Sequence, residues 1–557
     1  MRAARGTGLL AAGVLLAASP CAALEQAPRS ATGTRGAVAA AHPLAVEAAL
    51  DMLERGGNAV DAAAAAAFAL GVVEPFGSGI GGDGVALVYS AATDQVVAYS
   101  YRCTGPHAVT EALWLEHNEE GWDNARGPAT PGMVAGTLLL HEDFGSLPLA
   151  DVMAPAIKHA TDGFPVEPTL AGILFDSHGK LSADEATAAI FLPDGLPPEQ
   201  GATLRNPDLA RSLGLIAEGG REAFYNGPLA QAIASHLQEQ GGWLSAEDFA
   251  RYKAHRREAL RVTHGDFEIH SAPLPFGGLG VLLNLNVLDH SSFDPALPLS
   301  EPMNLHAYIE SMRLSMQDRY AVSGDPEFVE APVAELLAKE YGARRAGEIL
   351  ADRALRRSEI KPGLEQVAAG SGSTTHLSVV DAEGNAVSLT QTLGGFFGCG
   401  TTIPGTGIVM NDQMKNFSRL DGSPNRFAPG KAMNSTQAPT IALRDGELEF
   451  VIGSPGNYRI LTTVVQMLVM RLDQGMDLEA ATVAPRIAAR HYGAIDLEGG
   501  WPEGTAEALE ARGHEVARHP GNDLYFGGTH AISRDPATGV LHAVADPRRG
   551  GAAGALP

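Results

Sequence analysis

The sequence predicts a mixed α+β fold, and two kinds of pattern lead to that prediction. Several stretches place apolar residues at helical spacing, and residues 374–392 alternate apolar and polar side chains as two successive strands do. The composition is that of a folded protein, because 45% of the 557 residues are hydrophobic and only 19% are charged. Length alone favours three or four domains.

The charge balance excludes one class of partner. The chain has 40 Lys and Arg residues against 65 Asp and Glu residues, which gives a formal net charge of −25. Such a chain repels phosphate backbones, so we expect no nucleic-acid partner.

The first 23 residues have the pattern of a secretory signal peptide. Arg2 and Arg5 precede the apolar stretch Leu9–Ala18, and Cys21–Ala23 supplies small residues at a cleavage site. We therefore expect export to the periplasm or the exterior. A lipid-anchored start at Cys21 is an alternative, although Pro20 before it suits a lipid-attachment signal poorly. The apolar stretch is too short to span a bilayer comfortably, and no later segment is predicted to do so.

Helices are predicted next along the chain. Ala39–Arg55 has an apolar face, Gly56 and Gly57 end that helix, and Asn58 caps a second, nearly all-apolar helix over Ala62–Leu70. Further helices are predicted over Pro131–Leu139, Leu149–Gly163, Asn206–Gly219, Pro228–Gln240, Ala246–Tyr252, Leu279–Leu288, Asn304–Tyr320 and Val333–Ile349.

Gly77–Gly82 matches the spacing G-x-G-x-x-G of dinucleotide-binding loops. That motif needs a strand before it and a helix after it. Here a helix precedes the glycines and Val85–Tyr89 alternates like a strand, so we expect close backbone packing and not a nucleotide cofactor.

Two strands are predicted on either side of the turn Ala382–Gly384. A three-residue loop pairs Asp381 with Asn385, so that Thr374 falls directly opposite Thr392. Opposed residues bring their Cβ atoms to about 4.5–5.5 Å, which allows a hydrogen bond between the two hydroxyls.

This hairpin has two interpretations. Thr is a good strand former, so a surface hairpin would explain the pattern. The alternative is that cutting the chain before Thr374 makes it an N-terminal nucleophile, whose own α-amino group, with a pKa of about 7.7–8, acts as the base. The preceding loop, residues 363–373, is small and polar, as a loop that must be cut should be.

After the hairpin, the sequence predicts a flexible loop over Gly394–Gly400, a strand over Thr406–Met410 and a turn over Asn411–Asn416. A strand over Glu449–Gly453 then leads to a helix over Arg459–Leu472. Gly456 and Asn457 lie just before that helix, where backbone N–H groups are natural donors to an oxyanion.

A set of motifs in this order resembles the γ-glutamyltranspeptidases, which belong to the N-terminal nucleophile hydrolase superfamily. The resemblance runs from about Gly36 to Gly550. The motifs are Gly56–Ala62, Val73–Pro75, Gly79–Gly82, Thr374–Asp381, Asn411–Met414, Pro429–Lys431, Pro439–Ile441, Gly453–Gly456 and Asp546–Gly550. The resemblance implies a four-layer αββα sandwich and self-cleavage between Ser373 and Thr374.

The resemblance also implies roles for individual residues. Thr374 would be the nucleophile, Thr392 would orient it, and the N–H groups of Gly456 and Asn457 would stabilise the oxyanion. The expected donor-binding residues are Arg102, Gln413, Asn416, Ser435 and Thr436. An arginine suits a substrate carboxylate because its planar fork pairs with both oxygens.

The implied reaction transfers a γ-glutamyl or related acyl group from a glutathione-like amide to water or to an amino acid or peptide amine. Residues 24–373 and 374–557 would form two fragments, intertwined as a heterodimer. The chemistry needs no metal and no other cofactor, and the sequence contains no H-E-x-x-H motif and no paired-cysteine spacing.

Three positions depart from the family pattern. Asn416 stands where the family usually has an acid facing the donor ammonium, Gly394 replaces a polar residue of the same pocket, and Asn457 replaces a second glycine. Asn tolerates unusual φ angles better than most residues. The first two changes favour an alternative activity, that of a glutaryl or cephalosporin-type acylase with weak γ-glutamyl activity. A catalytically silent binding relative is a second alternative, although Thr374 and Thr392 are both present.

Two other features leave their outcome open. Cys103 and Cys399 would either form one disulfide or remain two buried thiols. The loop over Arg419–Lys431 is shorter than the lid-bearing version in many family members, which predicts a more open pocket.

Overall fold

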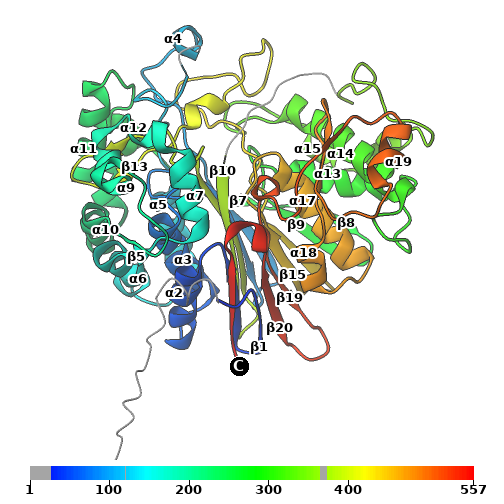
Figure 1. Cartoon of the computed structure of the whole chain (residues 1–557), viewed down its shortest axis with the longest axis horizontal. Coiled ribbons are helices and arrows are strands. Elements are labelled where there is room, and N and C mark those ends of the chain that lie inside the picture. The colour runs from blue at the N-terminus through cyan, green and yellow to red at the C-terminus, as the bar shows by residue number, and fades with distance from the viewer. Residues whose placement is uncertain (1–26, 119–120, 364–372) are drawn as a thin grey trace, which may run out of the picture.

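The computed structural model describes residues 27–118, 121–363 and 373–557, so the predicted signal peptide lies outside the described residues. Two seven-stranded sheets form the centre of the molecule (Figure 1). The first has the strand order β21 (Ala552–Leu556), β2 (Gly36–Ala40), β10 (Ser373–Asp381), β11 (Ala386–Gly394), β3 (Asp83–Ser90), β4 (Gln95–Tyr101) and β7 (His255–Glu258). The second has the order β1 (Ser30–Gly33), β20 (Leu541–Ala545), β19 (His530–Arg534), β15 (Glu447–Gly453), β14 (Thr440–Arg444), β9 (Phe267–Ser271) and β8 (Leu260–His264).

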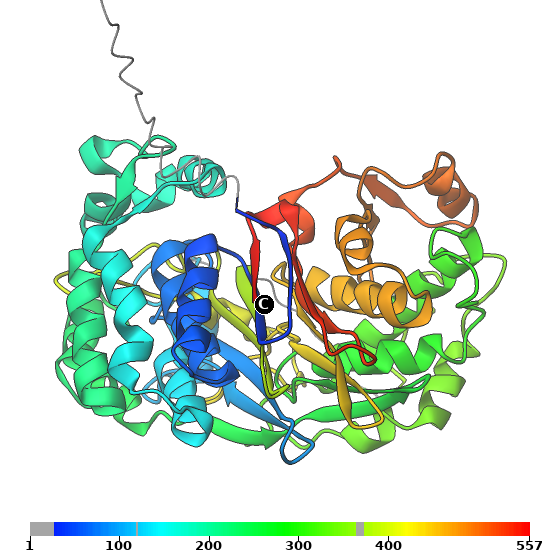
Figure 2. The same cartoon turned by 90° about the horizontal axis from the view of Figure 1, so that it is seen from below.

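The two sheets pack face to face, and helices cover both outer faces (Figures 1 and 2). Small and branched apolar residues from both sheets, such as Ala39 and Leu87 against Val451 and Ile532, form the layer between them. One outer face packs against α2 (Pro43–Glu54), α3 (Ala59–Val73), α5 (Met133–Phe144), α6 (Leu149–Asp162) and α10 (Pro207–Tyr225). The other packs against α13 (Gly278–Leu288), α14 (Pro302–Val322) and α17 (Arg459–Leu468). The predicted mixed fold is confirmed, and its layers run helix, sheet, sheet, helix.

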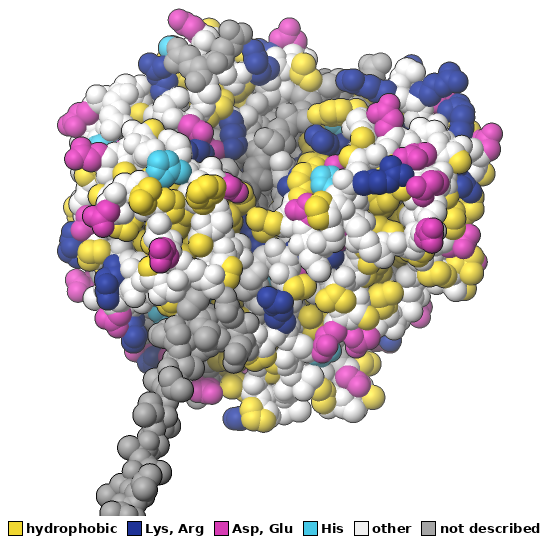
Figure 3. Space-filling view, viewed as in Figure 1, with side chains coloured by type: hydrophobic (Ala, Val, Ile, Leu, Met, Phe, Trp, Pro, Cys, Tyr) yellow, Lys and Arg dark blue, Asp and Glu magenta, His cyan; other side chains and the backbone are white. Residues whose placement is uncertain are grey.

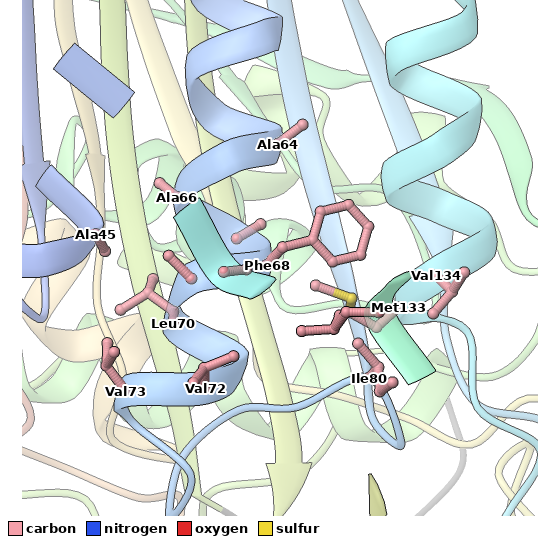
Figure 4. Packing of buried hydrophobic residues seen from close by; sticks show 14 of the residues in the cluster. Ala45, Ala64, Ala66, Phe68, Leu70, Val72, Val73, Ile80, Met133 and Val134 are labelled. Carbon is pink, nitrogen blue, oxygen red and sulfur yellow. The ribbon is translucent and has the colours of Figure 1, made fainter. Parts of the chain in front are cut away.

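Helix α3 is buried along its whole length, as its nearly all-apolar sequence predicts. Asn58 caps it in a reciprocal capping box with Asp61. Figure 4 shows Phe68 of this helix lying beside Met133 and Val134 of α5. Its run of alanines allows the neighbouring helices α2 and α6 to approach closely.

The remaining elements are short. The other helices are α4 (Glu111–His117), α7 (Pro168–Asp176), α8 (His178–Leu181), α9 (Glu185–Phe191), η2 (Pro193–Gly195), α11 (Pro228–Glu239), α12 (Ala246–Arg251), α15 (Val333–Leu336), α16 (Lys339–Ala346), η3 (Gln413–Asn416), η4 (Val469–Asp473), α18 (Leu478–Val483), α19 (Thr505–Ala511), η5 (Leu524–Phe526) and η6 (Pro547–Arg549). Small sheets are made by β5 (Phe164–Pro165) with β6 (Thr203–Leu204), by β12 (Thr402–Ile403) with β13 (Ile408–Val409), and by β16 (Ile487–Ala488), β17 (Ile495–Leu497) and β18 (Val516–Arg518). Within the described ranges, no helix combines the length and apolar character that crossing a bilayer requires.

Two predicted helices differ from the structure in kind, because part of one is a strand and the other is divided in two. The helix predicted over Ala39–Arg55 begins only at Pro43, because Gly36–Ala40 is strand β2, which lies between β10 and β21. The helix predicted over Val333–Ile349 is two helices, α15 and α16, separated at Leu337–Ala338.

Candidate active site

The start of β10 and the end of β11 lie together at one end of the first sheet. The predicted register is confirmed from Thr375, opposite Gln391, to Val380, opposite Ala386. The predicted direct pairing of Thr374 with Thr392 is wrong, because the ladder shifts between Ser373 and Thr375 and Ser373 pairs with Gly394. Between these two pairs, β11 has two residues, Thr392 and Leu393, opposite the single residue Thr374 of β10, so the bulge lies in β11.

Thr374 and Thr392 nevertheless lie on the same face of the sheet, toward the second sheet. On that face the ring Nδ1 of His376 lies 2.8 Å from the Thr390 hydroxyl. The alternate residues, such as Leu377, pack on the helix side. Thr374 and Thr392 are each 4% exposed. The Thr392 hydroxyl accepts the N–H of Gly394 at 2.9 Å, which fixes the end of the strand.

The next strands bring Arg102 to the same end of the sheet. Asp83, the first residue of β3, pairs with Thr392, and Gly84 pairs with Tyr101 at the end of β4. Arg102 follows directly and forms a buried ion pair with Asp83. The register thus places Thr392, Asp83 and Arg102 in one row across three strands.

The Arg102 guanidinium is largely occupied by protein groups. Its Nε donates to the carbonyl of Met433 at 3.0 Å, and its Nη2 donates to Gln413 Oε1 at 2.8 Å and to the carbonyl of Asn434 at 3.0 Å. Since Nη1 also donates to Asp83, the contacts with described residues leave one Nη1 hydrogen for a ligand. Burial raises the pKa of Asp83, and the charge of Arg102 opposes that rise.

Gln413 and Asn416 lie on the single turn η3 and join this network. Asn416 Nδ2 donates to the same Gln413 Oε1 that Arg102 contacts. A residue of helix α4 also contacts the turn: Trp114 Nε1 donates to the carbonyl of Met414 at 3.1 Å. Three of the predicted donor-binding residues are therefore connected by hydrogen bonds.

Ser435 and Thr436 approach from the second sheet. Gln437 donates from Nε2 to the carbonyl of Thr390 at 3.3 Å, so the two residues before it lie near the end of β11. The Ser435 hydroxyl donates to Gln437 Oε1 at 3.0 Å. Both Ser435 and Thr436 are partly exposed.

Gly456 and Asn457 form a loop at the same level. Gly453, at the end of β15, packs so closely on His376 that an added Cβ would lie 2.3 Å from its ring. The chain continues from there toward the level of Thr374. Gly456 has φ 127° and Asn457 has φ 61°, so the predicted tolerance of Asn457 for a left-handed conformation is confirmed. Arg459 begins α17 two residues later.

His376, two residues along β10 from Thr374, is not readily protonated. Burial, together with the nearby His530 ring, lowers the pKa of His376 well below its usual value. His376 therefore serves as a neutral hydrogen-bonding partner of Thr390 and Ser378. Within the described part of the chain, no group of three or more His, Cys, Asp or Glu side chains is arranged to hold a metal ion.

Cys103 and Cys399 are both buried and are not bonded to each other. Burial raises the pKa of the Cys103 thiol well above its usual value and that of Cys399 to about 12. The structure therefore has the second of the two predicted alternatives, a pair of unreactive thiols. The glycines of Gly77–Gly82 lie between α3 and β3, the opposite order to a dinucleotide-binding loop.

Sequence reasoning missed Asp83, Asp412 and Lys415. Asp83 could have been found by pairing the strand after Gly82 with the second strand of the hairpin, since an acid then falls opposite Thr392. Asp412 and Lys415 lie inside the predicted turn and form an ion pair beside Gly394 and Gly395. In Figure 3 the surface is hollowed between the two halves of the molecule, toward the end where β10 begins in Figure 1, and Lys and Arg side chains lie on both sides of the hollow.

Comparison with known proteins points to one family. A family model described as gamma-glutamyltranspeptidase matches residues 45–556. The acylase ACY 1 proenzyme of Pseudomonas sp. (strain SE83) is 36% identical over 91% of this chain and 91% of its own length. The glutathione hydrolase proenzyme of Escherichia coli (strain K12) is 36% identical over 92% of this chain and 90% of its own length. The crystal structure of cephalosporin acylase from Bacillus halodurans is 30% identical, with a TM-score of 0.87 over 95% of this chain and 97% of that one.

Proposed function

The chain belongs to the gamma-glutamyltranspeptidase family and is an N-terminal nucleophile amidohydrolase or transferase, and from that premise we propose that Thr374 is its self-generated nucleophile. The enzyme transfers a γ-glutamyl or related acyl group from a glutathione-like amide to water or an amine. One observation carries this proposal: the Ser373–Thr374 bond lies opposite a bulge of β11 that contains Thr392, at the end of the sheet where Arg102, Gln413 and Asn416 meet.

Maturation would begin with attack by the Thr374 hydroxyl on the carbonyl carbon of Ser373. The Ser373–Thr374 C–N bond breaks, an ester to the Thr374 oxygen forms, and the proton of the hydroxyl passes to the released amine. Water then hydrolyses the ester. This step frees the carboxylate of Ser373 and restores the hydroxyl of Thr374, which now carries an α-amino group.

The mature enzyme would use the same hydroxyl on a donor amide. The α-amino group of Thr374 accepts the hydroxyl proton as the oxygen attacks the donor carbonyl, and it returns a proton to the leaving amine. Backbone N–H groups of Gly456 and Asn457 stabilise the negative oxygen of the intermediate. Water or a second amine then attacks the acyl-threonine ester. Thr392 orients the nucleophile from the neighbouring strand.

Donor binding would rest on the hydrogen-bonded network around Gln413. Arg102, Ser435 and Thr436 bind the donor carboxylate, and Gln413 with Asn416 contacts the α-amino position. Arg102 is held rigidly by Asp83, so its remaining Nη1 hydrogen has a fixed direction. Preorganisation of this kind lowers the cost of ordering a side chain when the donor binds.

A second candidate function is that of an acylase for donors without an α-amine. The observation that favours it is the amide of Asn416, which is neutral and already donates to Gln413. A charge-assisted hydrogen bond contributes about 1.5–3 kcal/mol, so its loss would weaken a γ-glutamyl donor by roughly ten- to a hundredfold. The similar proteins include a glutathione hydrolase proenzyme as well as acylases, so they do not favour one donor class over the other.

We further propose that the protein is exported, on the strength of the signal-peptide pattern over residues 1–23. It would work as a heterodimer of residues 24–373 and 374–557 in the periplasm or outside the cell.

The deciding experiment is the denaturing intact mass of the purified protein, with N-terminal sequencing of its fragments. The expected result is two fragments, the second beginning at Thr374, and a single uncut chain for T374A. Hydrolysis of γ-glutamyl or glutaryl p-nitroanilide should accompany cleavage. An uncut and inactive wild-type chain from an exported preparation would overturn the proposal, because Thr374 would have no free amine to act as its base.

A further inference from the structure

The position of the Asp412 carboxylate requires a glycine at residue 394. This glycine ends strand β11 with φ +103°, and a Cβ added to it would lie 1.9 Å from Asp412 Oδ1. Real Cβ atoms essentially never approach another heavy atom so closely. The volume that a side chain at 394 would occupy is therefore filled by the carboxylate of Asp412, and Gln413 Nε2 lies 3.5 Å from the same point.

The Asp412 carboxylate is nearly buried and has two partners. Its Oδ1 accepts the N–H of Gly395 at 2.9 Å, and its Oδ2 pairs with Lys415 Nζ at 2.5 Å. Asp412 is 2% exposed, whereas the Lys415 side chain is 23% exposed. Asp412 directly precedes the turn η3 that carries Gln413, and Lys415 lies on that turn, so the ion pair lies at the wall of the proposed donor pocket.

The pair changes the charge that the pocket offers to a donor. Asp412 is an acid beside Gly394 and Gln413, where the proposed donor site places the α-amino group, but its counter-ion is the protein's own Lys415. A donor ammonium would have to displace Lys415 or lie beside a like charge, and both are unfavourable. An acyl group without an α-amine meets neither obstacle.

We propose that Lys415 is a specificity-determining residue: its ammonium pairs with Asp412 in place of a donor α-ammonium, and the enzyme therefore prefers dicarboxylic acyl donors that lack the α-amine, such as glutaryl amides. This inference rests on the proposed acyl-threonine chemistry of Thr374. At position 416 an acid is absent from the pocket, because the residue is asparagine. At position 412 an acid is present, but Lys415 already pairs with it.

The test compares γ-glutamyl and glutaryl p-nitroanilide on the matured enzyme. K415M should raise the ratio of kcat/KM for the γ-glutamyl donor to that for the glutaryl donor by about tenfold or more, because it frees Asp412 for the donor ammonium. K415R keeps the charge and should leave the ratio near that of the wild type. The double variant D412N/K415M should lose the gain, since the amide that replaces the Asp412 carboxylate can still accept the N–H of Gly395 but carries no charge.

K180M is a matched control for the removal of a lysine. Lys180 Nζ donates to the carbonyls of Gly398 at 2.8 Å and Phe396 at 3.3 Å and pairs with Asp123, so its charge is balanced by groups other than Asp412. Its replacement should leave the donor ratio unchanged. An unchanged ratio in K415M, or a gain that survives in D412N/K415M, would overturn the inference.

A binding measurement on the wild-type enzyme covers the case in which K415M fails to fold or mature. Calorimetric titration should show that glutarate binds at least tenfold more tightly than L-glutamate. Equal or tighter binding of L-glutamate would overturn the inference. Failure of the proposed function is distinguishable, because it would appear as an uncut chain that hydrolyses neither anilide.

Discussion

At the scale of single residues, Asn416 is where donor choice can be altered by the smallest change. Its Nδ2 donates to Gln413 Oε1, which also accepts from Arg102. An aspartate at 416 would place two acceptors together, and Arg102 holds the Gln413 amide in its present orientation, so the new carboxylate would turn away from Gln413. That carboxylate would then be available to a donor ammonium.

We therefore expect N416D to raise the ratio of γ-glutamyl to glutaryl hydrolysis by about tenfold. The measurement is kcat/KM for the two anilides on matured enzyme. N416A is the control, since it removes the amide without adding a charge and should not raise the ratio. A parallel fall for both donors in N416D would indicate that the turn of Gln413 had been disrupted, and would contradict the assigned role.

Other residues of the site show what sequence reasoning can and cannot reach. Local pattern and family resemblance predict Thr374, Thr392 and the Gly456–Asn457 loop, because the motifs that contain them follow one another in the order that the family shows. Asp83 and Lys415 are not predicted, because their roles depend on which strand pairs with β11 and on how one turn folds. Such contacts leave no periodicity in the sequence.

At the scale of elements, sequence patterns predict the pairing of two strands well where the strands are close together in the sequence. The β10–β11 register follows from a three-residue loop, and it holds until the bulge opposite Thr374. Strand β2 ends inside the helix predicted from Ala39, because its sequence, Gly36–Ala40, is short and alanine-rich. Its conformation is imposed by pairing with β10 and β21, which lie hundreds of residues away.

One ionic contact joins three elements and makes stability depend on pH. His264 ends β8 and lies 2.6 Å from Asp289 at the end of α13 and 2.8 Å from Asp473 in η4. Burial alone would lower the pKa of His264, but the hydrogen bonds and charges of the two carboxylates outweigh it and raise the pKa to about 9. The protonated ring is therefore favoured by folding.

The sign of the effect follows from the raised pKa. The stabilisation is fully present below pH 6.5, the usual pKa of an unfolded histidine, and it is lost as the pH rises through about 9. We expect H264Q to cost about 3 kcal/mol at pH 6 and progressively less toward pH 10. Calorimetric melting of wild type and variant across this range checks it. A pH-independent loss of stability in H264Q would contradict the assignment.

At the scale of the whole molecule, the residues before and after Thr374 are interleaved in both sheets. In the first sheet, β10, β11 and β21 come from the later part of the chain, and they pair with β2 and β3 from the earlier part. In the second, β14 pairs with β9, and β20 pairs with β1. The proposed cleavage before Thr374 would therefore divide the chain into two fragments, but each sheet would still contain strands of both fragments.

This interleaving predicts how the cut enzyme behaves in solution. To part, the two fragments would have to break the ladders β21–β2, β2–β10, β11–β3, β1–β20 and β14–β9 and expose the apolar layer between the sheets. Native size-exclusion chromatography should thus give one peak containing both fragments, at the volume of the uncut T374A chain. Separation should require denaturant and coincide with loss of the circular-dichroism signal. Fragments that part under native conditions would show that these five ladders contribute little to cohesion. They would also show that the strand of the proposed nucleophile is not held by the fragment that supplies Arg102.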